Sequence, residues 1–330
     1  MKKFISLITG VLVSAGNLSV FPVSAADWLT YGDFSYSVED DGGITIVEYN
    51  GKDAQIVIPE KIDGKNVTAI GACVFEENQT ITDVVLPGTI KKIGYKAFDS
   101  CKNLENINFP SSLEVIDSYA FTTCHTLSAI DIRNVKSIDE CAFQLCISLE
   151  EITVGGGVET IVDHAFHGCH SVDTLILCDG VKVIEEDAAL NMYSLRRVII
   201  PASVEEMGEH SVGYTCYYPN YTRIDAVIYG YPETSAEAYA AENGFKFVEI
   251  ANYGDVNSDG VVDSADATLI LEEYALTSTG GSSMFNANQT LCGDIDKSGT
   301  VNSSDASRVL EYYGYASTGG TDIPMFYFFG

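Results

Sequence analysis

The chain has 330 residues, of which 47 are acidic and 18 are basic, so its net charge is −29. This acidity argues against nucleic acid as a partner, and the length allows one long domain and one small domain. Beyond the first 25 residues, no stretch contains the roughly 20 consecutive apolar residues that a membrane span needs.

Residues 1–25 have the pattern of a secretory signal peptide. Lys2 and Lys3 precede an apolar run from Phe4 to Val13, and small residues ending at Ala25 precede the expected cleavage site. Cleavage would remove two lysines and no acid, which leaves 16 basic and 47 acidic residues and a net charge of −31. We therefore expect a secreted, extracellular protein.

From Val67 to about Val204 the chain repeats with a period of 23 residues, once 22. The pattern is I-x-x-x-A-F-x-x-C-x-x-L-x-x-I-x-F-P, and six coils are visible. A period of this length predicts a solenoid. The L-x-x-I-x-F segment alternates with period two, so we expect one short strand per coil and one parallel sheet over a continuous apolar column.

The repeat resembles the BspA-like leucine-rich repeats of bacterial surface proteins, and the resemblance covers about 27–250. It differs from the commoner leucine-rich consensus because Cys precedes the strand instead of following it. Residues 26–66 are expected to form the N-terminal cap of the solenoid, and 67–250 the repeats with a C-terminal cap around 228–248. Such caps keep the ends of a solenoid soluble.

Four of the nine cysteines occupy one slot of the repeat, at spacings of 23, 22 and 23 residues: Cys101, Cys124, Cys146 and Cys169. Asn78 and Met192 take the same slot at the two ends, which favours a buried filler with a free thiol. Adjacent coils about 5 Å apart would also allow bridging, so the sequence leaves the disulfide state open. An odd number of cysteines leaves at least one thiol free in the monomer.

No catalytic constellation stands out, and we predict that the protein is not an enzyme. His164, His167 and His170 beside Cys169 raise the question of a zinc site, but the repeat places the histidines in variable, exposed slots. The run G-E-H-S-V-G at 208–213 almost matches a nucleophile elbow, yet Glu209 stands where glycine is required. A hydrolase that uses Ser211 or His164 is the remaining alternative.

The outward strand positions carry no aromatic residue, so the sheet offers no stacking track for a polysaccharide. A tyrosine-rich stretch from Tyr214 to Tyr231, beside Ile176 and Ile199 that we expect to be exposed, is the better candidate surface. The same tyrosines could instead close the end of the solenoid. We predict a module for protein or surface interaction, and the alternative is a plant-cell-wall carbohydrate-binding module.

Two acidic 12-residue loops follow, D-V-N-S-D-G-V-V-D-S-A-D at 255–266 and D-I-D-K-S-G-T-V-N-S-S-D at 294–305. Each loop has glycine at position 6 and oxygen ligands at the spacing of an EF-hand calcium loop, with a backbone carbonyl from position 7. Position 12 is Asp instead of Glu, and no helix-like segment precedes either loop. We predict two calcium ions. The expected ligands are Asp255, Asn257, Asp259, Val261, Asp263 and Asp266 in the first loop, and Asp294, Asp296, Ser298, Thr300, Asn302 and Asp305 in the second.

An amphipathic helix is expected after each loop. Ala267, Ile270, Leu271 and Tyr274 fall at i, i+3, i+4 and i+7, and the same stripe recurs 39 residues later. The duplicated loop and helix resemble a type I dockerin over 253–330, which implies a cohesin module of a scaffoldin as the partner and a cellulosome as the setting. The resemblance also implies a cohesin-binding face on each copy. Its residues here are Ser264, Ala265, Leu269, Glu272, Ser303, Ser304, Arg308, Glu311 and Tyr312.

The predicted fold is thus α/β: a leucine-rich-repeat solenoid with a parallel sheet, plus a small all-α calcium-binding dockerin domain. The predicted protein is a noncatalytic cellulosome component, extracellular and associated with a cellulosome or a cell surface. Either dockerin face could dock if the internal twofold is close, although Leu269 against Arg308 could bias the choice. The sequence does not name the ligand of the solenoid.

Overall fold

The computed structural model describes residues 28–250, 254–257, 261–285, 287–295, 298 and 300–318. The expected signal peptide at 1–25 and the last part of the expected dockerin, 319–330, lie outside these residues. No helix within the described ranges is long and apolar enough to cross a membrane.

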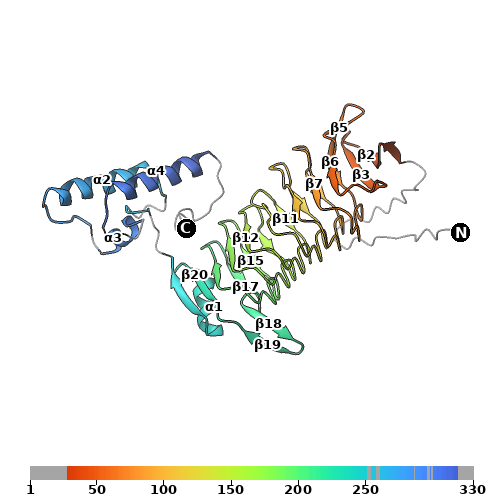
Figure 1. Ribbon diagram of the computed structural model, residues 1–330. Helices are drawn as coiled ribbons and strands as arrows, with labels where there is room; N and C mark the ends of the chain where they lie inside the picture. Colours follow the sequence, from red (N-terminus) through yellow and green to blue (C-terminus); the bar gives the residue numbers. More distant parts are fainter. Residues whose placement is uncertain are drawn as a thin grey trace.

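A three-stranded antiparallel meander closes the N-terminal end of the solenoid (Figure 1). It consists of β1 (Leu29–Tyr31), β2 (Phe34–Val38) and β3 (Ile44–Tyr49). β3 then pairs in parallel with β6 (Lys65–Ile70), which also pairs antiparallel with β5 (Lys61–Ile62). The alternating apolar residues of these strands, such as Tyr36 and Ile44, are buried, so the cap joins the core of the repeats.

The coils contribute strands to two parallel ladders along the solenoid. The first ladder carries the repeated isoleucines and consists of β6, β8 (Lys92–Ile93), β10 (Val115–Ile116) and β11 (Ser137–Ile138), then β13 (Thr160–Ile161), β15 (Val183–Ile184) and β17 (Glu206–Met207). The second consists of β4 (Gln55–Val57), β7 (Asp83–Val85) and β9 (Asn106–Ile107), then β12 (Glu151–Val154), β14 (Thr174–Leu177), β16 (Arg197–Ile199), β20 (Val227–Gly230) and β21 (Lys246–Glu249). The predicted parallel-sheet solenoid is confirmed, but the expectation of a single sheet is wrong, because strands of two residues are too short to show alternation in a sequence.

Both ladders are interrupted at the coil that is one residue short. Between Ile132 and Val154 a single bridge remains where the second ladder would continue. The shortened turn brings the backbone of Arg133 against Gly155, and a Cβ at Gly155 would lie only 1.7 Å from the Arg133 carbonyl oxygen. Only glycine fits there, so Gly155 accommodates the missing residue.

A column of five stacked phenylalanines runs through the core: Phe75, Phe98, Phe121, Phe143 and Phe166. Successive ring centroids lie 5.0, 5.2, 5.2 and 5.8 Å apart, with nearly parallel planes. The four cysteines of the repeat form a second buried column beside the rings. Each thiol donates to the carbonyl oxygen of a phenylalanine in the preceding coil, as Cys124 Sγ does to Phe98 O at 3.2 Å. The cysteines are therefore hydrogen-bonded links between coils as well as fillers.

All nine cysteines are free thiols. Burial raises the pKa of Cys101 and Cys169 to about 12, and it also raises the pKa of Cys124 and Cys146. At pH 8 these four thiols should remain protonated and react with iodoacetamide on the order of 100-fold more slowly than half-buried Cys216, because the thiolate is the nucleophile. Peptide mass spectrometry of the labelled protein measures this difference.

Labelling in guanidinium provides the control for the thiol prediction. All nine cysteines should then be modified without added reductant. Two cysteines of the core column that stay unmodified in denaturant and react only after reduction would show a disulfide. That result would contradict the free-thiol assignment.

The C-terminal end of the solenoid is closed by a hairpin, a helix and two strands (Figure 1). The hairpin consists of β18 (Tyr214–Tyr217) and β19 (Asn220–Arg223), and α1 spans Ser235–Asn243. Ile176 and Ile199 are buried with Ile250, and Tyr229 and Tyr231 pack on them. The expectation that Ile176 and Ile199 are exposed is therefore wrong, because the last coil covers the outer face of the sheet.

The C-terminal region is helical, with α2 (Ser264–Ser278), α3 (Ala287–Gly293) and α4 (Ser303–Ser317). α2 and α4 pack against each other over a small core that includes Val256, Ile270, Ile295 and Val309. α3 ends directly before the second acidic loop, so the expectation that no helix precedes either loop is wrong for that loop. Seven residues are too few for a clear helical pattern in the sequence.

Candidate calcium loops and docking helices

In the first acidic loop, Asp266 is fully buried at the N-terminus of α2 and closes the loop on itself. Its Oδ1 accepts from the backbone N–H groups of Val256 and Asn257 at 2.9 and 3.2 Å, and its Oδ2 accepts from Asp263 N–H at 3.0 Å. Asp263 in turn caps the helix by accepting from Ala265 N–H at 2.6 Å. Positions 9 and 12 therefore form a capping box that fixes the loop to the helix.

The second loop repeats this arrangement. Asp305 is fully buried, its Oδ1 accepts from Ile295 N–H and its Oδ2 from Asn302 N–H, both at 2.8 Å. Asn302 caps α4 by accepting from Ser304 N–H at 2.8 Å. The capping role of position 12 was missed in the sequence, although D-S-A-D and N-S-S-D match the pattern of an N-cap residue followed three positions later by an acid.

Four expected ligands of the second loop lie next to one another. Asp294 Oδ1 accepts from Ser298 N–H at 2.9 Å, and Ser298 Oγ lies 3.1 Å from Thr300 O. The Asn302 side-chain amide also donates to Thr300 O at 3.1 Å. The loop thus gathers carboxylate, hydroxyl, amide and carbonyl oxygens, a donor set that suits calcium.

Negative charge is concentrated and desolvated in the first loop. Asp255 and Asp266 are both buried, and burial, together with the nearby Asp255 carboxylate, raises the pKa of Asp266 against the opposing effect of its backbone hydrogen bonds. A carboxyl whose pKa rises on folding is held less stably as an anion, and a bound cation would offset that cost. Two further expected ligands, Asp259 and Asp296, lie outside the described residues.

The expected docking residues fall into two groups. Most are exposed on the first turns and outer faces of α2 and α4: Ser264, Ala265, Glu272, Ser303, Ser304 and Glu311, with Arg308 half-buried. Leu269 and Tyr312 are partly buried against the small core. Conversely, the predicted apolar stripe places Leu271, Leu310, Tyr274 and Tyr313 on the buried side of the helices, but all four are exposed. Leu271 and Leu310 are 43% and 45% exposed.

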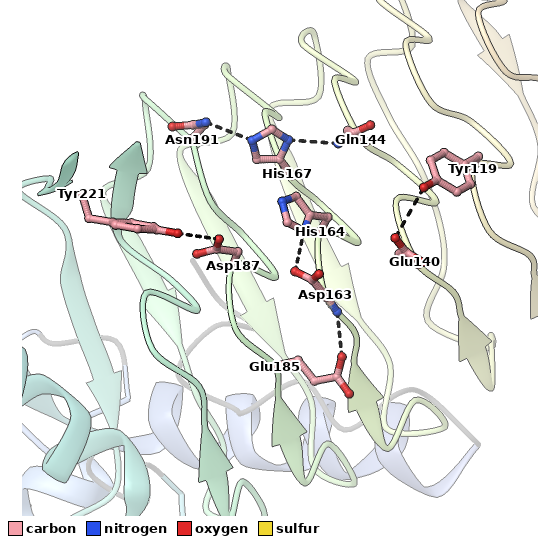
Figure 2. Close-up of polar contacts among 10 residues, drawn as sticks. All are labelled: Tyr119, Glu140, Gln144, Asp163, His164, His167, Glu185, Asp187, Asn191 and Tyr221. Atoms are coloured by element: carbon pink, nitrogen blue, oxygen red, sulfur yellow. Dashed lines mark hydrogen bonds and ion pairs between the residues drawn. The ribbon is translucent and has the colours of Figure 1, made fainter. Parts of the chain in front are cut away.

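The histidines of the fifth coil, His164, His167 and His170, do not form a zinc site with Cys169. His167 lies between Gln144 and Asn191, with its two ring nitrogens 3.2 and 2.9 Å from their side-chain amides (Figure 2). His164 contacts Asp163, and His170 packs on Tyr193. Cys169 is buried in the core column and donates to Phe143 O. Ser211 is also fully buried, so a nucleophilic role for it finds no support.

Most tyrosines of the 214–231 stretch pack or form hydrogen bonds at the C-terminal end of the solenoid. The Tyr214 and Tyr221 hydroxyls donate to Asn243 and Asp187, and Tyr229 and Tyr231 cover the buried isoleucines. Only Tyr217 and Tyr218, at the tip of the β18–β19 hairpin, stand free within the described part of this stretch, with exposures of 89% and 88%. Closing the end of the solenoid therefore accounts for most of these tyrosines, and only Tyr217 and Tyr218 keep the exposure that a binding surface needs.

Comparisons with known proteins match two separate regions of the chain. The family model for the BspA type leucine rich repeat region matches in six copies, over residues 54–172 and 126–223. The model for the dockerin type I domain matches residues 253–314. Domains of these two kinds are typically noncatalytic, and a dockerin implies a cohesin partner. No curated protein matches the chain.

Solved structures support the solenoid fold. The leucine rich repeat protein of T. pallidum is 26% identical with a TM-score of 0.55, and the match covers 67% of this chain and 97% of that one. A leucine rich cell surface protein from Faecalibacterium prausnitzii is 22% identical with a TM-score of 0.53, over 63% of this chain and 71% of that one. The chain therefore belongs to the BspA-type leucine-rich-repeat family and carries a type I dockerin domain C-terminal to its repeats.

Proposed function

We propose that the protein is a secreted, noncatalytic cellulosome component whose dockerin binds a scaffoldin cohesin in a calcium-dependent manner. The solenoid is then displayed for interaction with a protein or a surface. The observation that carries the proposal is the pair of duplicated loops, each closed by a buried Asp at position 12 and continued by a capped helix. The extracellular setting rests on the signal-like segment at 1–25.

Exposed apolar residues at equivalent positions support docking through α2 and α4. Leu271 corresponds to Leu310 and Tyr274 to Tyr313 across the 39-residue duplication, and all four are exposed. Repeated apolar side chains on a highly acidic protein indicate a surface that a partner covers. We propose that they extend the cohesin-binding face formed by the residues expected from the dockerin resemblance.

Calorimetry of the full chain against a panel of type I cohesins tests the docking function. Tight binding should occur in calcium and be lost with excess chelator. If either face can dock, Ala265→Asp or Ser304→Asp alone should retain most of the affinity, and the double variant should lose at least about 100-fold, or roughly 2.7 kcal/mol. Both residues are exposed at the starts of α2 and α4.

The control for this series is Ser278→Asp, which adds the same charge at the exposed last residue of α2. It should leave the affinity unchanged. No binding of the wild-type protein to any cohesin would remove the main support for the cellulosome setting, whereas calcium-independent binding would contradict the role of the metal alone.

We expect the first loop to bind calcium more tightly than the second. The first loop carries four carboxylates, Asp255, Asp259, Asp263 and Asp266, whereas the second carries three, Asp294, Asp296 and Asp305. Affinity rises with the charge of the ligand set. A calcium titration followed by NMR should saturate the resonances of α2 before those of α4, and the reverse order would contradict the ranking.

For the solenoid, the exposed tip of the β18–β19 hairpin keeps carbohydrate binding as a second candidate. Tyr217 and Tyr218 could stack on a sugar ring as readily as anchor a protein. Retention of the chain on insoluble plant-cell-wall polysaccharides, in excess free cohesin to occupy the dockerin, separates the two functions. Retention that Tyr217→Ala and Tyr218→Ala abolish would favour the carbohydrate, and its absence favours a protein or surface ligand.

A further inference from the structure

Three buried side-chain polar atoms have no hydrogen-bond partner among the described residues. Asp187 Oδ1 and His210 Nδ1 lie at the base of the β18–β19 hairpin, and Ser211 Oγ is the third. Asp187 is only 9% exposed, and its other carboxylate oxygen accepts from the Tyr221 hydroxyl at 2.9 Å (Figure 2). Buried acceptors of this kind are normally satisfied by a donor, a water or an ion.

The register of the solenoid brings these two side chains together. Asp187 and His210 lie three positions after Ile184 and Met207, in one slot of consecutive coils. Both have left-handed backbone conformations, with φ of 54° and 53°, as does the same slot in earlier coils at Lys96, Tyr119 and His164. The slot therefore directs its side chains into one stack along the solenoid, and Asp187 and His210 are neighbours in that stack.

Glu186 completes a set of three potential ligands. One atom from each of Glu186, Asp187 and His210 lies within 4.8 Å of the others. Tyr221 holds the arrangement from the hairpin side, because its ring stacks on the His210 imidazole with centroids 3.7 Å apart while its hydroxyl binds Asp187. Glu186 is exposed and offers access from solvent, and an open pocket of about 360 Å³ also reaches His210.

We propose that Glu186, Asp187 and His210 bind a divalent transition-metal ion of the zinc class. A cation would satisfy both unpartnered acceptors at once and would offset the two adjacent carboxylates. One imidazole nitrogen with two carboxylate oxygens suits zinc better than calcium, which prefers an all-oxygen shell. Because Asp187 and His210 come from consecutive coils and both contact Tyr221, the ion ties the hairpin with Tyr217 and Tyr218 at its tip to the solenoid.

Zinc titration of the full chain in millimolar calcium tests the site, since calcium occupies the dockerin loops. One zinc ion per chain should bind, and X-ray absorption at the zinc edge should show nitrogen and oxygen neighbours at about 2.0–2.2 Å without sulfur. His210→Gln and Glu186→Gln should each weaken zinc binding by at least about 10-fold, in the range seen when metal-site groups are removed. Glu186 is exposed, so its variant should fold normally even if the His210 variant does not.

Two matched variants separate this site from other zinc ligands. His125→Gln removes a half-buried histidine of an earlier coil, and Cys216→Ala removes the half-buried thiol paired with Tyr221 across the hairpin. Both should bind zinc like the wild-type protein. The proposal is overturned if the wild-type chain binds no zinc, because water would then be the partner of the unpaired Asp187 and His210 atoms. It is also overturned if Glu186→Gln has no effect or if Cys216→Ala abolishes binding.

Discussion

Removing calcium with a chelator should unfold the dockerin and leave the solenoid folded. The dockerin core is small, and the described part of it contains only eight buried apolar side chains, among them Ile270 and Val309. Domains of this size commonly depend on metal ligation for stability. We expect far-UV circular dichroism to lose the helical signal of α2 and α4 and to keep the β signal of the repeats.

The physical reason is the charge that the loops bury. Asp255, Asp266 and Asp305 are all buried, and in the first loop Asp255 adds to the cost of ionising Asp266. Backbone hydrogen bonds to Asp266 offset only part of that cost. A bound calcium ion would supply the missing positive charge, and its binding energy would then become folding energy.

The control for this prediction is the solenoid in the same sample. Its thermal transition should shift little between calcium and chelator, while the dockerin transition should disappear and return when calcium is restored. Magnesium should substitute poorly because it prefers a smaller, octahedral shell. A dockerin that keeps its helical signal and its protection from proteolysis in chelator would show that the loops are not structural metal sites.

The core slots of the solenoid could be predicted because a regular period fixes them. Ile116, Phe121 and Cys124 each occupy a slot that recurs in neighbouring coils, and all three are buried as expected. Stacked coils give equivalent residues equivalent surroundings, so one correct register places the whole column. The same argument favoured a buried filler for the four cysteines of the column but left their disulfide state open, and the structure has them as free thiols.

The left-handed slots could not be predicted from residue type. Lys96, Tyr119, Asp187 and His210 have positive φ, although glycine or asparagine is the usual residue there. Hydrogen bonds between coils hold these positions, as from Lys96 N–H to Ser118 O at 3.1 Å and from Tyr119 N–H to Glu140 O at 3.0 Å. The repeat register places Asp187 and His210 in the same slot of consecutive coils. Their shared left-handed backbone conformation is seen only in the structure.

In the dockerin, the loops were easier to predict than the helix faces. The positions of Asp255 and Asp266 follow from a 12-residue spacing, whereas Leu271 and Tyr274 fall on an apolar stripe that normally indicates a core. The structure buries Ala267 and Ile270 and leaves the other two exposed. A surface that binds a partner has the same periodicity as a buried one, so the sequence alone does not separate them.

Phe121→Ala should destabilise the solenoid by about 3–5 kcal/mol, the usual cost of removing a fully buried phenylalanine. Its ring stacks between those of Phe98 and Phe143 with centroids 5.2 Å from each, and Phe109 packs on it from the side at 5.6 Å. The truncation therefore leaves a cavity in the middle of the column and removes three aromatic contacts. Urea denaturation in calcium, followed by the circular dichroism of the β-sheet, measures the change in the free energy of unfolding.

Tyr193→Ala is the matched control, because Tyr193 is an aromatic residue of the same repeats but is exposed and contacts His170 on the surface. It should change the free energy of unfolding by no more than about 0.5 kcal/mol. Because each coil contacts only its neighbours, Phe121→Ala could also split the transition into two halves of the solenoid. A single transition with a loss below about 1 kcal/mol would contradict the prediction, since the coils would then be held together mainly by their backbone ladders and not by the phenylalanine column.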